Sequence, residues 1–236
     1  MRCSLLSLFP PLLLLVPAAA SQALTITIGA SDSGWFDESG NHTSTNENYQ
    51  AGWRNAEFRN FFVFDTSLIP AGETILSATL RAYNPDIGEP DVTFTGGYDS
   101  PDASETYQLV EVSTPALSFA ATHVGTGLTI FTDLGDGPIY GTQISTASDN
   151  GAFVEVPLNA TGLAALDAAV GDFVLGGYLS SLSSAFGTDE FIWGHTDPPE
   201  LGPYARELVV VMTPEPTTGL LLALGLVALS TLRRRV

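Results

Sequence analysis

The segment from Ser31 to Asn48 concentrates oxygen-bearing side chains that suit a hard metal ion. It holds the carboxylates of Asp32, Asp37 and Glu38 together with several asparagines. Calcium is bound in proteins by roughly six to eight oxygens from carboxylates, amides and carbonyls. We therefore interpret Asp32, Asp37 and Glu38 as a candidate calcium site, with the turn 133–137 as a smaller one. Neither segment has the EF-hand spacing, so a solvated loop is the competing interpretation.

Aromatic residues in and beside the same segment suggest a second kind of site. Trp35, Tyr49 and Trp53 lie in or next to the polar loop. Flat rings surrounded by polar side chains stack on the faces of sugar rings. These three residues are therefore a candidate carbohydrate-binding site. The competing interpretation is that the rings close the ends of the hydrophobic core.

Residues suited to catalysis are present but scattered. The sequence has no H-E-x-x-H, no G-x-S-x-G and no phosphate loop with a lysine. His42, His123 and His195 lie far apart along the chain. The adjacent acids 37–38 and 189–190 would point to opposite faces of a strand, so neither pair forms an acid–base couple. We expect no catalytic residues and a non-enzymatic protein; a polysaccharide-modifying enzyme with a spatially assembled site is a weaker alternative.

The charge of the chain excludes several classes of partner. The 236 residues carry a formal net charge of −18, and all eight basic residues are arginine. Residues 24–212 hold 25 of the 26 acids and only four arginines, a formal charge of −21. Nucleic-acid binding and attachment to anionic lipid both require basic surfaces, so neither is expected. The length and the 44% hydrophobic content predict one folded domain.

The two ends of the chain are typical of export signals. Residues 1–23 combine Arg2, an apolar stretch and small residues before Leu24, which predicts a cleaved signal peptide. Cys3, the single cysteine, lies in this removed part, so the mature chain would contain no thiol. At the other end, residues 213–236 contain a Pro-Glu-Pro box, a short apolar stretch and an arginine cluster. The residues of this candidate signal are Pro214, Glu215, Pro216, Arg233, Arg234 and Arg235.

The apolar part of this tail is a short transmembrane helix by its composition. At about 1.5 Å per residue it falls short of the ~30 Å hydrocarbon core, which suits a transient anchor. The arginine cluster would remain on the cytoplasmic side. The tail resembles the PEP-CTERM sorting signal of exported proteins of Gram-negative bacteria that make extracellular polysaccharide. That resemblance implies recognition and cleavage by exosortase near the Pro-Glu-Pro box, after transit through the inner membrane.

Between the two ends, short β-like runs alternate with turn clusters, which predicts an all-β fold. The run Asn60–Asp65 is continuously apolar and suits a strand buried on both faces. A helix is predicted around Leu163–Val170, with Asn159 as one candidate cap and Gly171 as the stop. The other predicted strands are 24–28, 74–83, 92–95, 106–112, 128–131, 139–144, 153–158, 173–179, 190–193 and 207–212.

The body of the chain also resembles known β-sandwiches. The segments 59–65, 69–72 and 75–81 are similar to the opening hairpin of DNRLRE-type and carbohydrate-binding-module-like domains. The segment 153–158 with the following helix resembles the later half of the same domains. The resemblance implies a jelly-roll-like antiparallel sandwich with one short helix over residues 24–212. It does not identify a ligand.

Together these features predict an exported protein of the cell surface or extracellular matrix, associated with exopolysaccharide and biofilm. Its expected partners are exosortase and extracellular polysaccharide, with no nucleic acid. Calcium is a possible ligand, through which the acidic domain would bridge to anionic sugars. A specific carbohydrate-binding module remains the main alternative.

Overall fold

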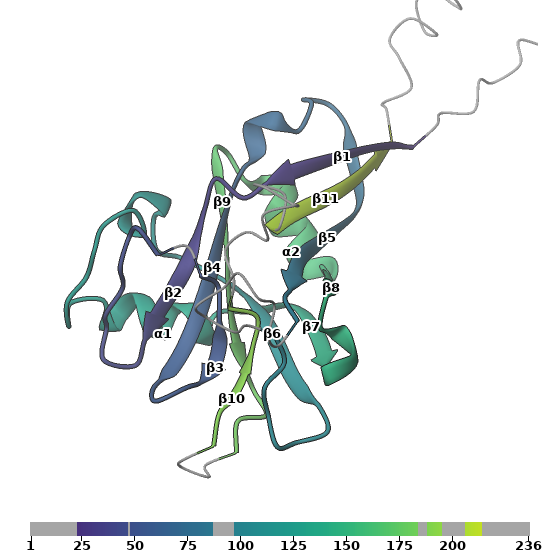
Figure 1. The fold of residues 1–236 in the computed structure, drawn as a ribbon. Coiled ribbons are helices and arrows are strands. Elements are labelled where there is room, and N and C mark those ends of the chain that lie inside the picture. Colours follow the sequence, from purple (N-terminus) through teal and green to yellow (C-terminus); the bar gives the residue numbers. More distant parts are fainter. Residues whose placement is uncertain (1–22, 47, 87–96, 184–187, 195–205, 214–236) are drawn as a thin grey trace, which may run out of the picture.

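Two antiparallel sheets form the body of the protein in the computed structural model (Figure 1). The structure describes residues 23–46, 48–86, 97–183, 188–194 and 206–213. The four-stranded sheet has the order β1 (Leu24–Gly29), β11 (Arg206–Thr213), β5 (Thr74–Asn84) and β8 (Ala152–Pro157). The expected all-β sandwich is confirmed.

The larger sheet has seven strands. Its order is β10 (Glu190–Ile192), β3 (Ala51–Trp53), β4 (Glu57–Asp65), β9 (Asp172–Leu179), β6 (Glu105–Glu111) and β7 (Ile139–Ser145), with β2 (Asp32–Asp37) also paired to β4. Three short 3-10 helices lie in the connections: Thr66–Leu68, Ala116–Ser118 and Ala147–Asp149. β2 and β3 fall within or just after the segment that the sequence analysis treated as a loop.

Strand β4 contributes to two separate cores, as its continuous apolar run predicted. Phe62 and Phe64 point into the core between the two sheets. Phe61 and Val63 point to the other face of the larger sheet, where a second core lies. Because successive side chains of a strand alternate between faces, one apolar run fills both layers.

The second core is covered by a helix that the sequence analysis assigned as a strand. Residues 128–131 belong to α1 (Leu128–Asp136), which packs against the outer face of the larger sheet. Its buried residues Ile130, Phe131 and Leu134 occupy one helical face. A short apolar run is compatible with either state, and here the need to cover β4 selects the helix. The expectation of a single helix is therefore wrong.

The predicted second helix is present with a slightly different end. α2 (Ala160–Ala168) begins at Asn159, whose side chain accepts hydrogen bonds from the backbone N–H groups of Thr161 and Gly162. It packs against β5 and β7. Val170 lies beyond its last turn and is 96% exposed, so it does not share the buried face of Leu166. Gly171 has a positive φ of 85°, but it lies two residues beyond the extended C-cap Ala169, so the prediction that Gly171 stops the helix is wrong.

The two ends of the domain leave it side by side. β1 pairs with β11 along its whole length, with Leu24 opposite Met212. Figure 1 shows the start of β1 and the end of β11 together at one end of the domain, while β10 and the start of β6 lie at the opposite end. No helix among the described residues is long and apolar enough to cross a membrane. The predicted strand 92–95, the signal peptide and the C-terminal tail lie outside the described residues.

Candidate functional site

The carboxylates predicted to bind calcium are not gathered at one point. Asp32 begins β2 and Asp37 ends it, opposite Val63 and Phe58 of β4 respectively. At about 3.3 Å per residue the two positions are roughly 16 Å apart along the strand. Asp37 also accepts hydrogen bonds from the backbone N–H groups of Ser39 and Asn41 and from the Asn41 amide. Its oxygens shape the turn after β2.

The predicted sugar-binding aromatics divide between surface and core. Tyr49 is fully buried, and its hydroxyl donates a hydrogen bond to the backbone carbonyl of Tyr83. Tyr49 is therefore not on a surface that a sugar ring would contact. Trp35 and Trp53 are half-buried, on β2 and β3. The ring of Trp35 meets Phe58 edge-on, with 5.1 Å between centroids.

Two of the three histidines converge, although their spacing in the sequence does not predict it. His42 and His123 form an isolated antiparallel bridge, and their rings lie 6.4 Å apart. Both nitrogens of the buried His42 ring lie 2.9 Å from backbone carbonyl oxygens, those of Trp35 and Phe119. Burial lowers the pKa of His42, against the opposing effect of these carbonyls. The ring therefore fastens the 112–127 segment onto β2; His195 lies outside the described residues.

A different set of acids does converge, at the end of the sandwich opposite the termini. Carboxylate oxygens of Asp102, Glu105 and Glu190 lie within 4.8 Å of one another. Glu105 is completely buried at the start of β6, and Glu190 is 1% exposed at the start of β10. Asp102 is exposed. We call these three residues the acidic cluster.

Alternation along β6 explains why Glu105 points inward. Glu105, Tyr107 and Leu109 share the face that contributes to the core between the sheets. Glu190 reaches the same place because β10 pairs with β3, with Phe191 opposite Gly52. Gly52 has a φ of +124°, and a Cβ there would collide with the backbone carbonyl of Glu190. A glycine at this position is therefore required for the two strands to approach.

The buried carboxylates of the cluster are surrounded by hydroxyl groups. Glu105 accepts hydrogen bonds from the hydroxyls of Ser100, at 2.6 Å, and Ser181. Glu190 accepts from the hydroxyl and the backbone N–H of Ser183. None of the ion pairs between described residues includes a member of the cluster.

The negative charge of the cluster affects the pKa of the neighbouring Tyr98. Its hydroxyl donates a 2.6 Å hydrogen bond to the backbone carbonyl of Asp102. Burial raises the pKa of this hydroxyl, and the charges of Glu105, Asp102 and Glu190 raise it further against the effect of Ser100. Sequence analysis missed the cluster because its members come from distant segments. The inward register of Glu105 on β6 was the available signal.

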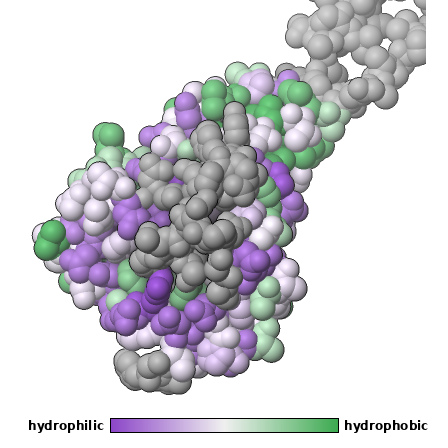
Figure 2. Space-filling model, viewed as in Figure 1, coloured by the Kyte–Doolittle hydropathy of each residue, from purple (hydrophilic) through white to green (hydrophobic). Residues whose placement is uncertain are grey.

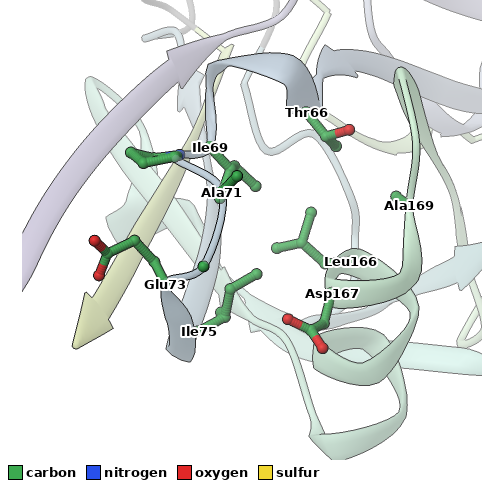
Figure 3. A pocket seen from close by; sticks show the side chains of 10 residues that line it. Thr66, Ile69, Ala71, Glu73, Ile75, Leu166, Asp167 and Ala169 are labelled. Atoms are coloured by element: carbon green, nitrogen blue, oxygen red, sulfur yellow. The ribbon is translucent and has the colours of Figure 1, made fainter. Parts of the chain in front are cut away.

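Two hollows among the described residues lie away from the cluster. One of about 210 Å³ lies between the loop after Thr66 and the C-terminal end of α2. Figure 3 shows Ile69, Ile75 and Leu166 lining it, with the carboxylate of Glu73 turned away. A second hollow of about 280 Å³ lies beside Tyr140. Both are below the range of about 300–1,000 Å³ that is usual for small-molecule sites.

Comparison with known protein families identifies the C-terminal tail. Residues 213–235 match the PEP-CTERM protein-sorting motif. The match includes all six residues predicted to form the signal, Pro214, Glu215, Pro216, Arg233, Arg234 and Arg235. A comparison of the chain with curated proteins finds no match. The motif is that of an exported protein that is sorted and processed by exosortase.

Proposed function

We propose that the mature domain is a non-enzymatic component of the cell surface or polysaccharide matrix of a Gram-negative bacterium. The sorting motif supports this proposal, because it is that of an exported protein. The motif begins at Thr213, the last residue of β11. The domain therefore reaches the Pro-Glu-Pro box with no intervening linker. Signal peptidase and exosortase would both act at the end where β1 and β11 pair.

The surface near this end has an apolar character that suits a membrane boundary. Large hydrophobic residues exposed on the elements there include Leu24, Leu68 and Leu76. Figure 2 shows hydrophobic residues gathered at the upper end of the domain, where β1 and β11 lie in Figure 1, and hydrophilic residues over the lower part of the same face. While the tail is still in the membrane, the acidic cluster would face outward.

The charge of the domain favours an indirect attachment to anionic polysaccharide. Residues 24–212 carry a formal charge of −21, which repels an anionic polymer. Divalent cations held between carboxylates on both partners would replace this repulsion with attraction. In this proposal the protein is retained in the matrix by many such bridges after exosortase has cut the tail.

The alternative is a specific carbohydrate-binding module. The observation that favours it is the partial exposure of Trp35 and Trp53, either of which could stack on a sugar ring. Trp35 pairs with Asn60 and Trp53 with Glu57 of β4, so the two rings lie on opposite faces of the larger sheet and would act separately. Trp35→Ala with Trp53→Ala would abolish glycan binding in that case. Under the matrix proposal the same double variant would remain associated with polysaccharide.

Two measurements on producing cells test the proposed function. Intact mass of the surface-located protein should show an N-terminus near Leu24 and a C-terminus near Pro214. Chelation with EDTA should then release the processed protein from the polysaccharide fraction. Recovery of surface protein that extends to Val236 would contradict processing, and retention in EDTA would contradict attachment through divalent cations.

A further inference from the structure

We propose that Asp102, Glu105 and Glu190 bind one calcium ion inside the domain, with the hydroxyl of Ser145 as a further ligand. The site goes beyond the proposed function, since the ion would join parts of one chain and requires no polysaccharide. It also lies on different residues from the calcium site expected from the sequence, Asp32, Asp37 and Glu38.

The burial of the carboxylates is the first argument. Glu105 and Glu190 are 0% and 1% exposed, and their oxygens approach one another and Asp102 within 4.8 Å. Negative charges at this distance repel one another, and in a water-poor setting a cation lying among them would offset that repulsion. The hydroxyl donors of Ser100, Ser181 and Ser183 compensate for lost water but carry no positive charge.

An unpartnered hydroxyl beside the cluster is the second and independent argument. Ser145 is 1% exposed, and its Oγ atom has no hydrogen-bond partner. Ser145 lies directly opposite Glu105 in the antiparallel pairing of β6 and β7. Directly opposed side chains share one face of a sheet, with Cβ atoms about 4.5–5.5 Å apart. A buried hydroxyl next to a carboxylate would normally donate to it, so an oxygen left unpaired here is suited to a metal ion.

The identity of the ligand atoms selects the ion. Every candidate ligand is an oxygen, and neither of the described histidines, His42 and His123, belongs to the cluster. Oxygen-only sets favour calcium or magnesium over zinc and copper. Three carboxylates give up to six oxygens, and Ser145 adds another. Calcium accepts roughly six to eight oxygens in flexible arrangements, whereas magnesium demands an octahedron and retains water.

Such an ion would fasten one end of the sandwich. Glu105 begins β6, Glu190 begins β10, and Ser145 ends β7, so the ion would link three strands that are distant in sequence. β10 has only three residues and is held by its pairing with β3 and by a bridge between Phe191 and Asp99, to which the ion would add a further link. The hydroxyls that already bond the two glutamates would then orient them as an outer shell.

Calcium binding to the full chain, purified in mild detergent and stripped with EDTA, tests the proposal. Calorimetric titration with CaCl2 alone should show one ion per chain with a dissociation constant of about 1 mM or lower. Magnesium at the same concentration should compete weakly. Glu105→Gln and Glu190→Gln should each weaken calcium binding at least tenfold, whereas Glu38→Gln, a matched control in the other acidic segment, should bind as the wild type does.

Ser145→Ala separates ligation from folding. Without calcium its melting temperature should equal or exceed that of the wild type, because the lost hydroxyl has no partner to lose. Its calcium affinity should nevertheless fall severalfold. The proposal is overturned if the wild type binds no calcium at 10 mM, an excess of about tenfold over the weakest expected constant. It is equally overturned if both glutamine variants bind calcium like the wild type, or if only Glu38→Gln loses binding. Failure of EDTA to release the protein from polysaccharide would bear on the proposed function alone.

Discussion

The chain contains two acidic regions that differ in how their carboxylates are used. In the 31–48 segment the acids lie close together along the chain. The carboxylate oxygens of Asp37 accept hydrogen bonds from Ser39 and Asn41 within the turn that follows β2. In the acidic cluster, Glu105 and Glu190 come from strands 85 residues apart and are buried together. If calcium binds as we propose, burial and convergence of acids indicate a cation site better than their local density in the sequence does.

The largest expected difference between the regions concerns their tryptophans. Trp193 follows β10 directly, is fully buried and meets the Tyr107 ring at 4.5 Å. Trp193→Ala should lower the free energy of unfolding by about 3–5 kcal/mol, through lost burial and a residual cavity. Trp35→Ala, in the half-buried position on β2, should cost about 1–2 kcal/mol. Urea unfolding followed by circular dichroism measures both, and equal losses would contradict the assigned burial.

Salt should distinguish general screening from bound calcium. The melting temperature is expected to rise with NaCl, because screening relieves the repulsion among the acids. CaCl2 at matched ionic strength should raise the melting temperature further. The added free energy of unfolding should be about 2.7 kcal/mol at a hundredfold excess of calcium over its dissociation constant. Asp32→Asn with Asp37→Asn should keep the calcium increment, whereas Glu105→Gln with Glu190→Gln should lose it. If Asp32→Asn with Asp37→Asn loses the calcium increment, the calcium site lies in the 31–48 segment and not at the acidic cluster.

Acid should destabilise the protein through His42, which belongs to the 31–48 segment. Burial lowers its pKa below the ordinary value of 6.5. The unfolded chain therefore binds a proton at a higher pH than the folded protein does. Stability should fall as the pH drops below about 6.5, by at most about 1.4 kcal/mol per pH unit, until the folded pKa is reached. Denaturant unfolding between pH 5 and 8 checks this. In His42→Gln the free energy of unfolding should depend less on pH over the same range.

The smallest expected effect concerns Asp133. Like Asp37, it has carboxylate oxygens that accept hydrogen bonds from neighbouring groups, here N–H and hydroxyl groups. It accepts hydrogen bonds from Ser113 and Thr114, which lower its pKa despite the opposing effect of burial. Its contribution is present above the unfolded pKa near 3.8 and is lost as the pH falls through the folded value. Asp133→Asn should cost about 1 kcal/mol at neutral pH. Thermal melts should show no change for Asp136→Asn, the exposed control in α1.

Much of the fold was predictable because periodicity reports burial directly. The apolar run of β4 indicated burial on both faces, and Asn159 indicated the start of α2. α1 was not predictable, since its short apolar run is compatible with strand or helix, and only the need to cover the apolar outer face of β4 decides between them. β2 and β3 were missed because polar and glycine residues interrupt their alternation.

The candidate sites were less predictable than the fold. Sequence spacing can bring neighbours together, but the acidic cluster depends on the register of β6 with β7 and of β10 with β3. The meeting of His42 with His123 likewise depends on a bridge between two loops. The C-terminal tail was predictable because its three parts are contiguous in the chain, and the family match at 213–235 confirms it.

Locating the bound ion tests the central claim most directly. Crystals of the processed protein grown with CaCl2 and measured at a long wavelength would reveal calcium by its anomalous scattering. We predict one peak between the carboxylates of Glu105 and Glu190, with oxygens of Asp102 and Ser145 about 2.3–2.6 Å away. A map without a peak there, or with its peak beside Asp32, Asp37 and Glu38, would contradict the account.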